Sequence, residues 1–226
     1  MTIHDMKNYS TPRRESFLTD HLAIKLLFGF MLVAVMTVFS HRFLDAAISS
    51  AFYKLIRVNR LMPFVSHIPD LLFYIVVAVT TCSWIGYWYR IRRGHADNHA
   101  RFLKLCGMTA PLAFLAKMIF QYLFGRSNPE LWAVYHHAPQ FHWFRAGTGY
   151  GCFPSGHMTV FTALTAALWR HYPHHKFLYL GFLAALALAL IATNYHFLSD
   201  VIAGAYLGAI VCLLVSRAVD GPRPPR

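Results

Sequence analysis

Long runs of apolar residues alternate with short polar segments along the 226-residue chain. A helix needs about 20 predominantly apolar residues to cross the roughly 30 Å hydrocarbon core of a bilayer. The pattern therefore predicts an all-α, polytopic membrane protein whose six transmembrane helices form one bundle. The runs that approach the required length lie at 22–43, 68–89, 103–124, 155–171, 177–195 and 199–217.

The polar ends of the chain frame this membrane domain. Residues 1–20 are interpreted as a cytoplasmic N-terminal tail, 21–217 as one six-helix domain, and the Pro- and Arg-rich residues 218–226 as a disordered C-terminal tail. The first apolar run is long and lacks a small-residue cleavage site before its charged flank. We therefore interpret it as a retained span and not as a signal peptide.

Residues 44–60, between the first two runs, combine apolar and charged positions with a helical period. Such a helix suits the headgroup layer of a membrane, where it would border a path for lipid entry. A simple surface connector would show the same pattern, and the sequence favours neither interpretation.

Composition agrees with a membrane location, because 57% of the residues are hydrophobic and only 13% are charged. Lys and Arg are more frequent in the polar segments on the side of the two termini than in the alternate segments. The positive-inside rule then predicts that both termini are cytoplasmic. The formal net charge of +12 is interpreted as this topology signal together with affinity for anionic headgroups, so no nucleic-acid partner is expected.

The four cysteines, Cys82, Cys106, Cys152 and Cys212, have no paired spacing, so no disulfide framework is predicted. Cys152 lies just before Pro154 on the outer side of the membrane. It is either a reactive thiol or an ordinary small apolar residue, and the absence of a neighbouring base in the sequence favours the second interpretation.

The longest polar segment, 125–153, is rich in aromatic residues and is expected to cap the active site. Aromatic side chains here would anchor the loop at the interface or contact a headgroup. Its histidines, His136, His137 and His142, match no helical metal-ligand pair, so no metal is expected.

The most informative motif is Pro154-Ser155-Gly156-His157, at the start of an apolar run. Proline is well suited to the first turn of a helix, where the amides of the next residues have no intrahelical acceptor. These amides, the Ser155 hydroxyl and the close approach that Gly156 permits predict an anion site. His157 is placed to exchange a proton with the bound group.

A second motif supplies a nucleophile. His196 and Asp200 lie four residues apart, which predicts that they share one face of a helix. The carboxylate would hold one imidazole nitrogen protonated, so that the other attacks phosphorus and forms a phosphohistidine. A buried structural His-Asp pair would also fit, but ionisable residues within membrane helices are costly and usually functional.

At these residues the chain resembles the type 2 phosphatidic acid phosphatase superfamily of integral membrane lipid phosphatases. The signature of that family combines Lys-x6-Arg-Pro, Pro-Ser-Gly-His and Ser-Arg-x5-His-x3-Asp, and the resemblance spans the last five predicted helices. It implies that His196 is the nucleophile, Asp200 its partner and His157 the general acid and base.

Three cations of the family pattern are missing from their usual places. Gln121 stands where the lysine belongs, Asn128 stands at the first arginine, and Ala189-Leu190 replaces the Ser-Arg pair. Other positive groups must then stabilise the charge on the phosphoryl oxygens.

Arg126 is the first candidate for this charge. Lys117, one helical turn before Gln121, is the second, and Arg145 in the capping loop is the third. With these cations, Ser155, Gly156 and Asn128 complete the predicted phosphate-binding set.

These features predict a metal-independent lipid phosphatase without a cofactor, in a bacterial inner membrane with its active site on the periplasmic or outer face. Its partners are the bilayer and a lipid phosphate: phosphatidate, phosphatidylglycerol phosphate, undecaprenyl pyrophosphate or a lipid A type. A phosphotransferase with the same nucleophile is one alternative. A non-catalytic protein that binds or transports lipid phosphates is another. The sequence does not indicate an oligomeric state.

Overall fold

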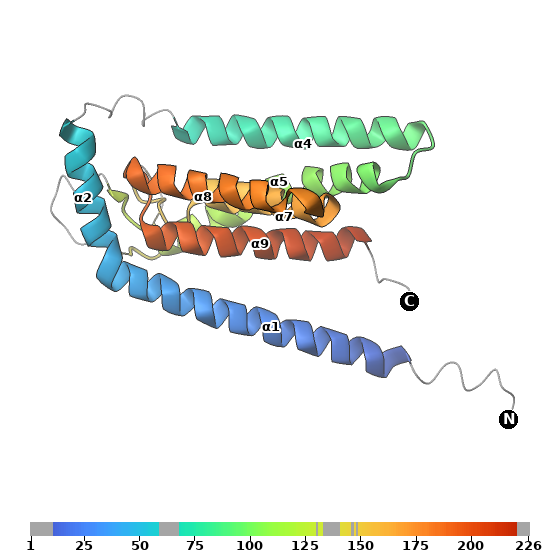
Figure 1. Ribbon diagram of the computed structural model, residues 1–226, viewed down its shortest axis with the longest axis horizontal. Helices are drawn as coiled ribbons and strands as arrows, with labels where there is room; N and C mark the ends of the chain where they lie inside the picture. The colour runs from blue at the N-terminus through green and yellow to red at the C-terminus, as the bar shows by residue number, and fades with distance from the viewer. Residues whose placement is uncertain are drawn as a thin grey trace, which may run out of the picture.

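The protein was analysed as a computed structural model that describes residues 11–58, 68–129, 131–132, 141–145, 147 and 149–220. The side chains of 11–22, 55–58, 68–70 and 220 lie outside this description. The regular elements of the described residues are all helical, which agrees with the predicted all-α class (Figure 1). In chain order they are α1 (Thr11–Phe39), the π-helical turn η2 (Ser40–Leu44), α2 (Asp45–Val58), α4 (Ile68–Arg92), α5 (Asn98–Phe124), α7 (Gly156–His171), the 3-10 turn η3 (Pro173–His175), α8 (Lys176–Ala192) and α9 (Leu198–Asp220).

Helices α5, α7 and α9 pack against one another and form the centre of the bundle. Helix α4 packs on α5, α1 on α9, and α8 on α7. Helix α2 turns away from the direction of α1 and crosses one end of the bundle (Figure 1). The start of α1 and the end of α9 both lie at the opposite end, as expected for an even number of passes.

Among the residues that the structure describes, five helical segments are long and apolar enough to cross a membrane. The sixth predicted span, 155–171, corresponds to α7, which has only 16 residues. At 1.5 Å per residue α7 is about 24 Å long, shorter than a bilayer core. It begins at the Ser155 cap and ends at Tyr172, and its buried positions lie among α5, α8 and α9. The expectation of six spans is therefore met for five of them by length and composition.

Two glycines allow α9 to approach α7 closely. A Cβ atom at Gly204 would lie 2.5 Å from the carbonyl oxygen of Ser155, and one at Gly208 would lie 2.2 Å from that of Thr159. Both distances are far below van der Waals contact, so no side chain is accommodated at either position. The Gly-x3-Gly spacing thus brings the backbones together, a packing mode common between membrane helices. It also holds the start of α7 beside the start of α9.

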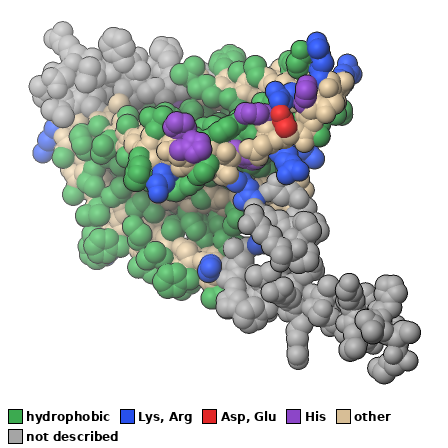
Figure 2. All heavy atoms as spheres, turned by 45° about the vertical axis from the view of Figure 1, so that its right-hand side comes forward, with side chains coloured by type: hydrophobic (Ala, Val, Ile, Leu, Met, Phe, Trp, Pro, Cys, Tyr) green, Lys and Arg blue, Asp and Glu red, His purple; other side chains and the backbone are tan. Residues whose placement is uncertain are grey.

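The outer surface follows from the same apolar pattern. Large hydrophobic side chains are exposed along the flanks, among them Phe28 and Val38 of α1 and Phe177 and Leu188 of α8. Figure 2 shows these flanks as broad hydrophobic areas, with Lys, Arg and His side chains gathered toward the end of the bundle that its view brings forward. Such a surface suits a lipid environment along the flanks and water at the end.

The segment 44–60, interpreted above as a headgroup-layer helix or a connector, forms α2 up to Val58, and residues 59–60 lie outside the description. Asp45 and Ser49 on α2 are buried against the bundle. Ser49 donates a hydrogen bond to the side-chain oxygen of Asn194 at 2.7 Å. The helix is thus attached to the bundle by polar contacts, which neither interpretation included.

The α7–α9 contact gives a direct test of this packing. We expect Gly208→Ala to destabilise the protein by about 1–3 kcal/mol, the usual cost of overpacking, because its new methyl group meets the Thr159 carbonyl. Thermal unfolding in detergent measures the effect. Gly181→Ala on α8 is the matched control, because a Cβ there meets nothing within 4 Å. Equal melting of the two variants would contradict the close approach.

Candidate active site

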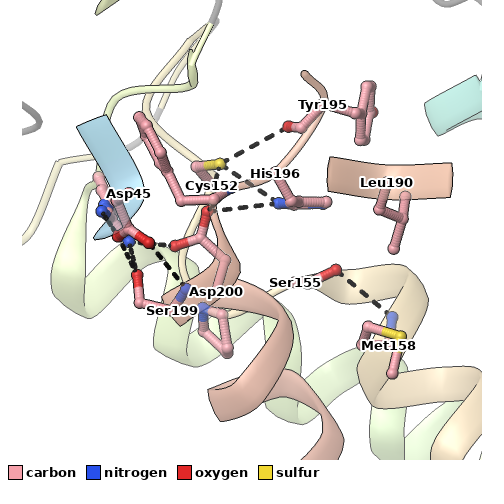
Figure 3. A network of polar contacts seen from close by, with 12 residues as sticks. Asp45, Cys152, Ser155, Met158, Leu190, Tyr195, His196, Ser199 and Asp200 are labelled. Atoms are coloured by element: carbon pink, nitrogen blue, oxygen red, sulfur yellow. Dashed lines mark hydrogen bonds and ion pairs between the residues drawn. The ribbon is translucent and has the colours of Figure 1, made fainter. Parts of the chain in front are cut away.

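Four residues that the sequence singled out lie near one another and near Asp45 (Figure 3): Cys152, Ser155, His196 and Asp200. Cys152 and Ser155 come from the segment before α7, His196 from the turn before α9, and Asp200 from the first turn of α9. Asp45 joins them from α2. Residues from three separate parts of the chain thus form one buried polar cluster.

A buried guanidinium between two carboxylates lies at the centre of this cluster. Arg126 is 0% exposed, and so are the side chains of Asp45 and Asp200. Its Nη2 donates to Asp45 Oδ2 at 2.7 Å, and its Nη1 donates to Asp200 Oδ1 and to Ser199 Oγ. Among the described residues, its Nε atom has no hydrogen-bond partner.

The Arg126 charge is maintained by these neighbours. Burial works against the charged form, but Asp200 and Asp45 more than offset that cost and raise the pKa of Arg126. The rings of Phe197 and Phe141 lie 4.4 and 5.1 Å from the guanidinium carbon. The group is therefore surrounded by carboxylates and aromatic rings, and it has no exposed surface for a substrate.

Asp45 connects the N-terminal part of the chain to the start of α9. Its Oδ1 accepts hydrogen bonds from the Ser199 amide and from Ser40 Oγ, both at 3.1 Å. The π-helical turn Ser40–Leu44 immediately precedes it, and His41 Nδ1 lies 3.0 Å from Arg126 Nη2. Single π-helical turns often occur at functional sites, and here the turn places two side chains against Arg126.

His196 and Asp200 are close together, although they do not share a helix. Helix α9 begins at Leu198, so His196 lies in the preceding turn, and the predicted common helix face is wrong. The turn nevertheless brings His196 Nδ1 to 3.7 Å from Asp200 Oδ2. The Phe197 amide donates to the same carboxylate oxygen at 2.9 Å and fixes its orientation.

The Cys152 thiol lies beside both members of this pair (Figure 3). Its sulfur is 3.2 Å from His196 Nδ1 and 3.0 Å from Asp200 Oδ2. Burial and the nearby Asp200 carboxylate raise the pKa of Cys152 well above its ordinary value, so the thiol keeps its proton. A protonated, buried thiol agrees with the interpretation of Cys152 as an unreactive residue, yet its position in the site was not expected from the sequence.

The two histidines of the predicted mechanism face each other. The ring centroids of His157 and His196 are 6.3 Å apart, and Tyr195 contacts both rings edge-on. The two side chains are nearly buried, with 7% and 6% of their surface exposed. The two imidazoles thus lie within the contact range of aromatic rings, in a T-shaped arrangement.

Helix α7 begins at Gly156, so Pro154 lies before the helix and not, as the motif predicts, in its first turn. Ser155 is the N-cap, and its hydroxyl oxygen accepts from the Met158 amide at 3.4 Å. The Ser155 amide, however, donates to the Asp200 carbonyl at 3.0 Å, so it is not available to an anion. The predicted contact of Ser155 with phosphate therefore rests on its hydroxyl hydrogen.

The candidate cations occupy different environments. The Lys117 stem lies along Gly156, where a Cβ would come within 3.0 Å of its Cδ, and its Nζ lies 4.7 Å from the Phe114 ring centroid. Lys117 is thus beside the start of α7. Arg145 is exposed, and its guanidinium carbon lies 3.9 Å from the centroid of the Tyr150 ring.

Two polar residues replace the family's cations. Gln121 donates to the Pro154 carbonyl at 3.2 Å, so it supports the motif from α5. The side-chain oxygen of Asn128 accepts from the Leu131 amide at 2.8 Å, a local turn contact that occupies this oxygen. His136 and His137 of the capping loop lie outside the described residues, whereas His142 contacts the Tyr150 ring.

Sequence reasoning missed Asp45. A signal was present, because Asp45 is the one acidic residue between Asp20 and Asp70, in a stretch that is otherwise apolar and basic. An isolated carboxylate beside a membrane span usually has a buried partner. The partner itself was not evident, since Arg126 lies 81 residues away in the chain.

A comparison with protein-family models gives the family of the chain. The model of the PAP2 superfamily matches residues 101–223, more than half of the chain. The chain belongs to the PAP2 superfamily. The match covers α5 to α9, including His157, His196 and Asp200, whereas Asp45 lies before it. Membership supports a membrane lipid phosphatase as the general class of protein.

A comparison with solved structures matched a PAP2 structure. It is the crystal structure of the first transmembrane PAP2 type phosphatidylglycerolphosphate phosphatase from Bacillus subtilis. The match has 22% identity and a TM-score of 0.46, and it covers 87% of this chain and 95% of that chain. A comparison with curated proteins gave no match.

The buried ion pairs predict a severe effect of removing Arg126. Arg126→Met would leave Asp45 and Asp200 as unpaired buried carboxylates, which we expect to destabilise the protein by about 3–5 kcal/mol. Denaturant or thermal unfolding in detergent measures this cost. Arg145→Met, at an exposed arginine, should change stability by less than about 1 kcal/mol. Wild-type stability of Arg126→Met would refute the structural role.

Proposed function

We propose that this PAP2 protein is a membrane lipid phosphatase that removes a terminal phosphate from a lipid headgroup through a phosphohistidine on His196. The observation that carries the proposal is the facing pair of His196 and His157, with ring centroids 6.3 Å apart beside the start of α7. The family supports phosphatase chemistry in general, and the site residues supply groups suited to each step.

In the first step His196 attacks phosphorus. Its Nδ1 faces Cys152 and Asp200, so Nε2 is the ring nitrogen left to form the N–P bond. As the P–O bond to the lipid breaks, His157 gives its proton to the departing alkoxide or phosphate oxygen. Water then attacks the phosphohistidine, His157 takes a proton from that water, and inorganic phosphate leaves with the His196 lone pair restored.

Lys117 is the cation that we assign to the phosphate. Its stem packs on Gly156, one residue before His157, and its Nζ lies over the Phe114 ring. Arg126 is assigned to positioning Asp200, because both of its carboxylate partners are buried with it. This reverses the order of the two cations expected from the sequence. Asn128 and the Ser155 hydroxyl remain proposed neutral contacts.

The substrate class follows from the location of the site. The flanks expose large apolar side chains, and the polar cluster lies at one end of the bundle. A lipid could place its chains along the flank and its phosphate at the cluster. The basic end, opposite the site, would face the cytoplasm by the positive-inside rule. The site would then face the periplasmic or outer side of a bacterial inner membrane.

Release of inorganic phosphate by purified protein in detergent tests the proposal. The substrates are phosphatidate, phosphatidylglycerol phosphate, undecaprenyl pyrophosphate and a lipid A type phosphate. We expect release from at least one, abolished in His196→Ala, unchanged in His95→Ala at the exposed opposite end, and resistant to chelators.

Other outcomes would identify the alternatives. Transfer of the phosphate to an acceptor lipid, with no release to water, would indicate a phosphotransferase. Binding of lipid phosphates without turnover would indicate a non-catalytic protein. Complete loss of activity in chelator, with rescue by a divalent ion, would overturn metal independence.

Lys117→Met tests the assignment of the cation. Losing one preorganised positive group should lower kcat/KM by about 10²- to 10³-fold, because transition-state charge is no longer stabilised. Phosphate release against the best substrate measures the effect. Lys104→Met is the matched control, on the same helix nearer the opposite end, and should leave kcat/KM unchanged. Equal rates for the two variants would exclude Lys117 from phosphate binding.

A further inference from the structure

Three donor atoms of different chemical types converge beside the proposed nucleophile. They are Cys152 Sγ, His196 Nδ1 and Asp200 Oδ2, and each lies within 4.8 Å of the other two. The separations are 3.2 Å for sulfur to nitrogen, 3.0 Å for sulfur to oxygen and 3.7 Å for nitrogen to oxygen. All three side chains are buried, so their positions are set by the packing of the site.

These separations, 3.0 to 3.7 Å, are close to the edge lengths of a zinc coordination tetrahedron. Bond lengths of about 2.3 Å to sulfur and about 2.0–2.2 Å to nitrogen or oxygen give ligand-to-ligand distances of about 3.3–3.6 Å. Thiolate, imidazole and carboxylate are also the three ligand types that Zn²⁺ uses in proteins. Three protein ligands leave a fourth position for water, as in other three-ligand zinc sites.

We propose that Cys152, His196 and Asp200 form a binding site for a thiophilic divalent metal of the Zn²⁺ class, and that metal bound there switches the phosphatase off. The binding site stands on its geometry alone. The inhibitory effect rests on the function proposed above.

The local charges suit such an ion. Asp45 and Asp200 carry two negative charges against the single positive charge of Arg126, so the buried cluster has a net charge of −1. Binding of the metal releases the thiol proton to solvent and leaves a thiolate, which adds a second negative charge. A divalent ion then brings the sum to zero. The cluster is thus more nearly neutral with the ion than without it, which favours binding in a buried place.

Inhibition follows from which nitrogen of the His196 imidazole carries the proton and which one has a free lone pair. A metal on Nδ1 uses the lone pair of that nitrogen, so the ring proton of neutral His196 must lie on Nε2. Nε2 then has no lone pair with which to attack phosphorus. The metal also takes Asp200 Oδ2, the oxygen next to Nδ1 in the metal-free site. One ion therefore removes the nucleophile without contact with the substrate.

Direct metal binding tests the site independently of activity. Tag-free protein in detergent is stripped with chelator and titrated with Zn²⁺ by equilibrium dialysis and with Co²⁺ by absorption spectroscopy. We expect one tight site and a thiolate-to-cobalt charge-transfer band. Cys152→Ser should lose the band and bind Zn²⁺ more than about 100-fold more weakly, since even an outer-shell change costs about 10–100-fold.

Control variants distinguish loss of the metal site from loss of folding. Cys82→Ser, at an exposed cysteine of α4, should bind both metals like the wild type. Cys152→Ala gives a second variant if Cys152→Ser fails to fold, and thermal unfolding checks both. Wild-type affinity in a folded Cys152 variant, or a cobalt spectrum without a thiolate band, would overturn the site.

Activity assays then test the switch. We expect Zn²⁺ to inhibit phosphate release at the concentrations that fill the tight site, with recovery after chelation and no inhibition by Mg²⁺ at the same concentration. Stimulation by Zn²⁺, or full activity with the site occupied, would overturn the inhibitory role. If no lipid is hydrolysed with or without metal, the proposed function and with it the switch fail, whereas the binding data still decide on the site.

Discussion

A buried arginine between two buried carboxylates is the interaction on which the rest of the site depends. Removing three charges from water costs several kcal/mol per ion unless each is paired and hydrogen-bonded. Arg126 meets this requirement with Asp45 from α2 and Asp200 from α9. The pairing therefore determines where α2 crosses the bundle, where the segment after α5 lies, and how the start of α9 is oriented.

The same interaction also positions Asp200 beside His196. Asp200 gives Oδ1 to Arg126, while Oδ2 accepts from the Phe197 amide and lies beside Cys152 and His196. A carboxylate held at both oxygens cannot rotate, so its negative charge stays beside His196 Nδ1. Asp45 is thus linked to His196 through Arg126 and Asp200, although it lies outside the region that the PAP2 family model matches.

The sequence predicted the helices well, because a membrane helix needs apolar residues both where it faces lipid and where it packs in the core. It also identified His157, His196 and Asp200 as a group, since ionisable residues are rare in such a chain. It did not predict that Asp45 and Arg126 pair, because no local pattern links residues so far apart. It placed His196 on the α9 helix through its spacing from Asp200, and the helix begins two residues later. The spacing of His196 and Asp200 indicated correctly that the two residues are close. The path of the backbone between them could be learned only from the structure.

Under the proposed function, the burial of Arg126 leaves a bound phosphate to be stabilised by other groups, and the glycine of the Pro-Ser-Gly-His motif then has a second role. Any side chain at Gly156 would meet the Lys117 stem, because a Cβ there lies only 3.0 Å from Lys117 Cδ. A substituent at Gly156 would thus displace Lys117 and also keep an oxyanion away from the backbone. The motif at the start of α7 and Lys117 on α5 therefore pack against each other, with Gly156 at the point of contact.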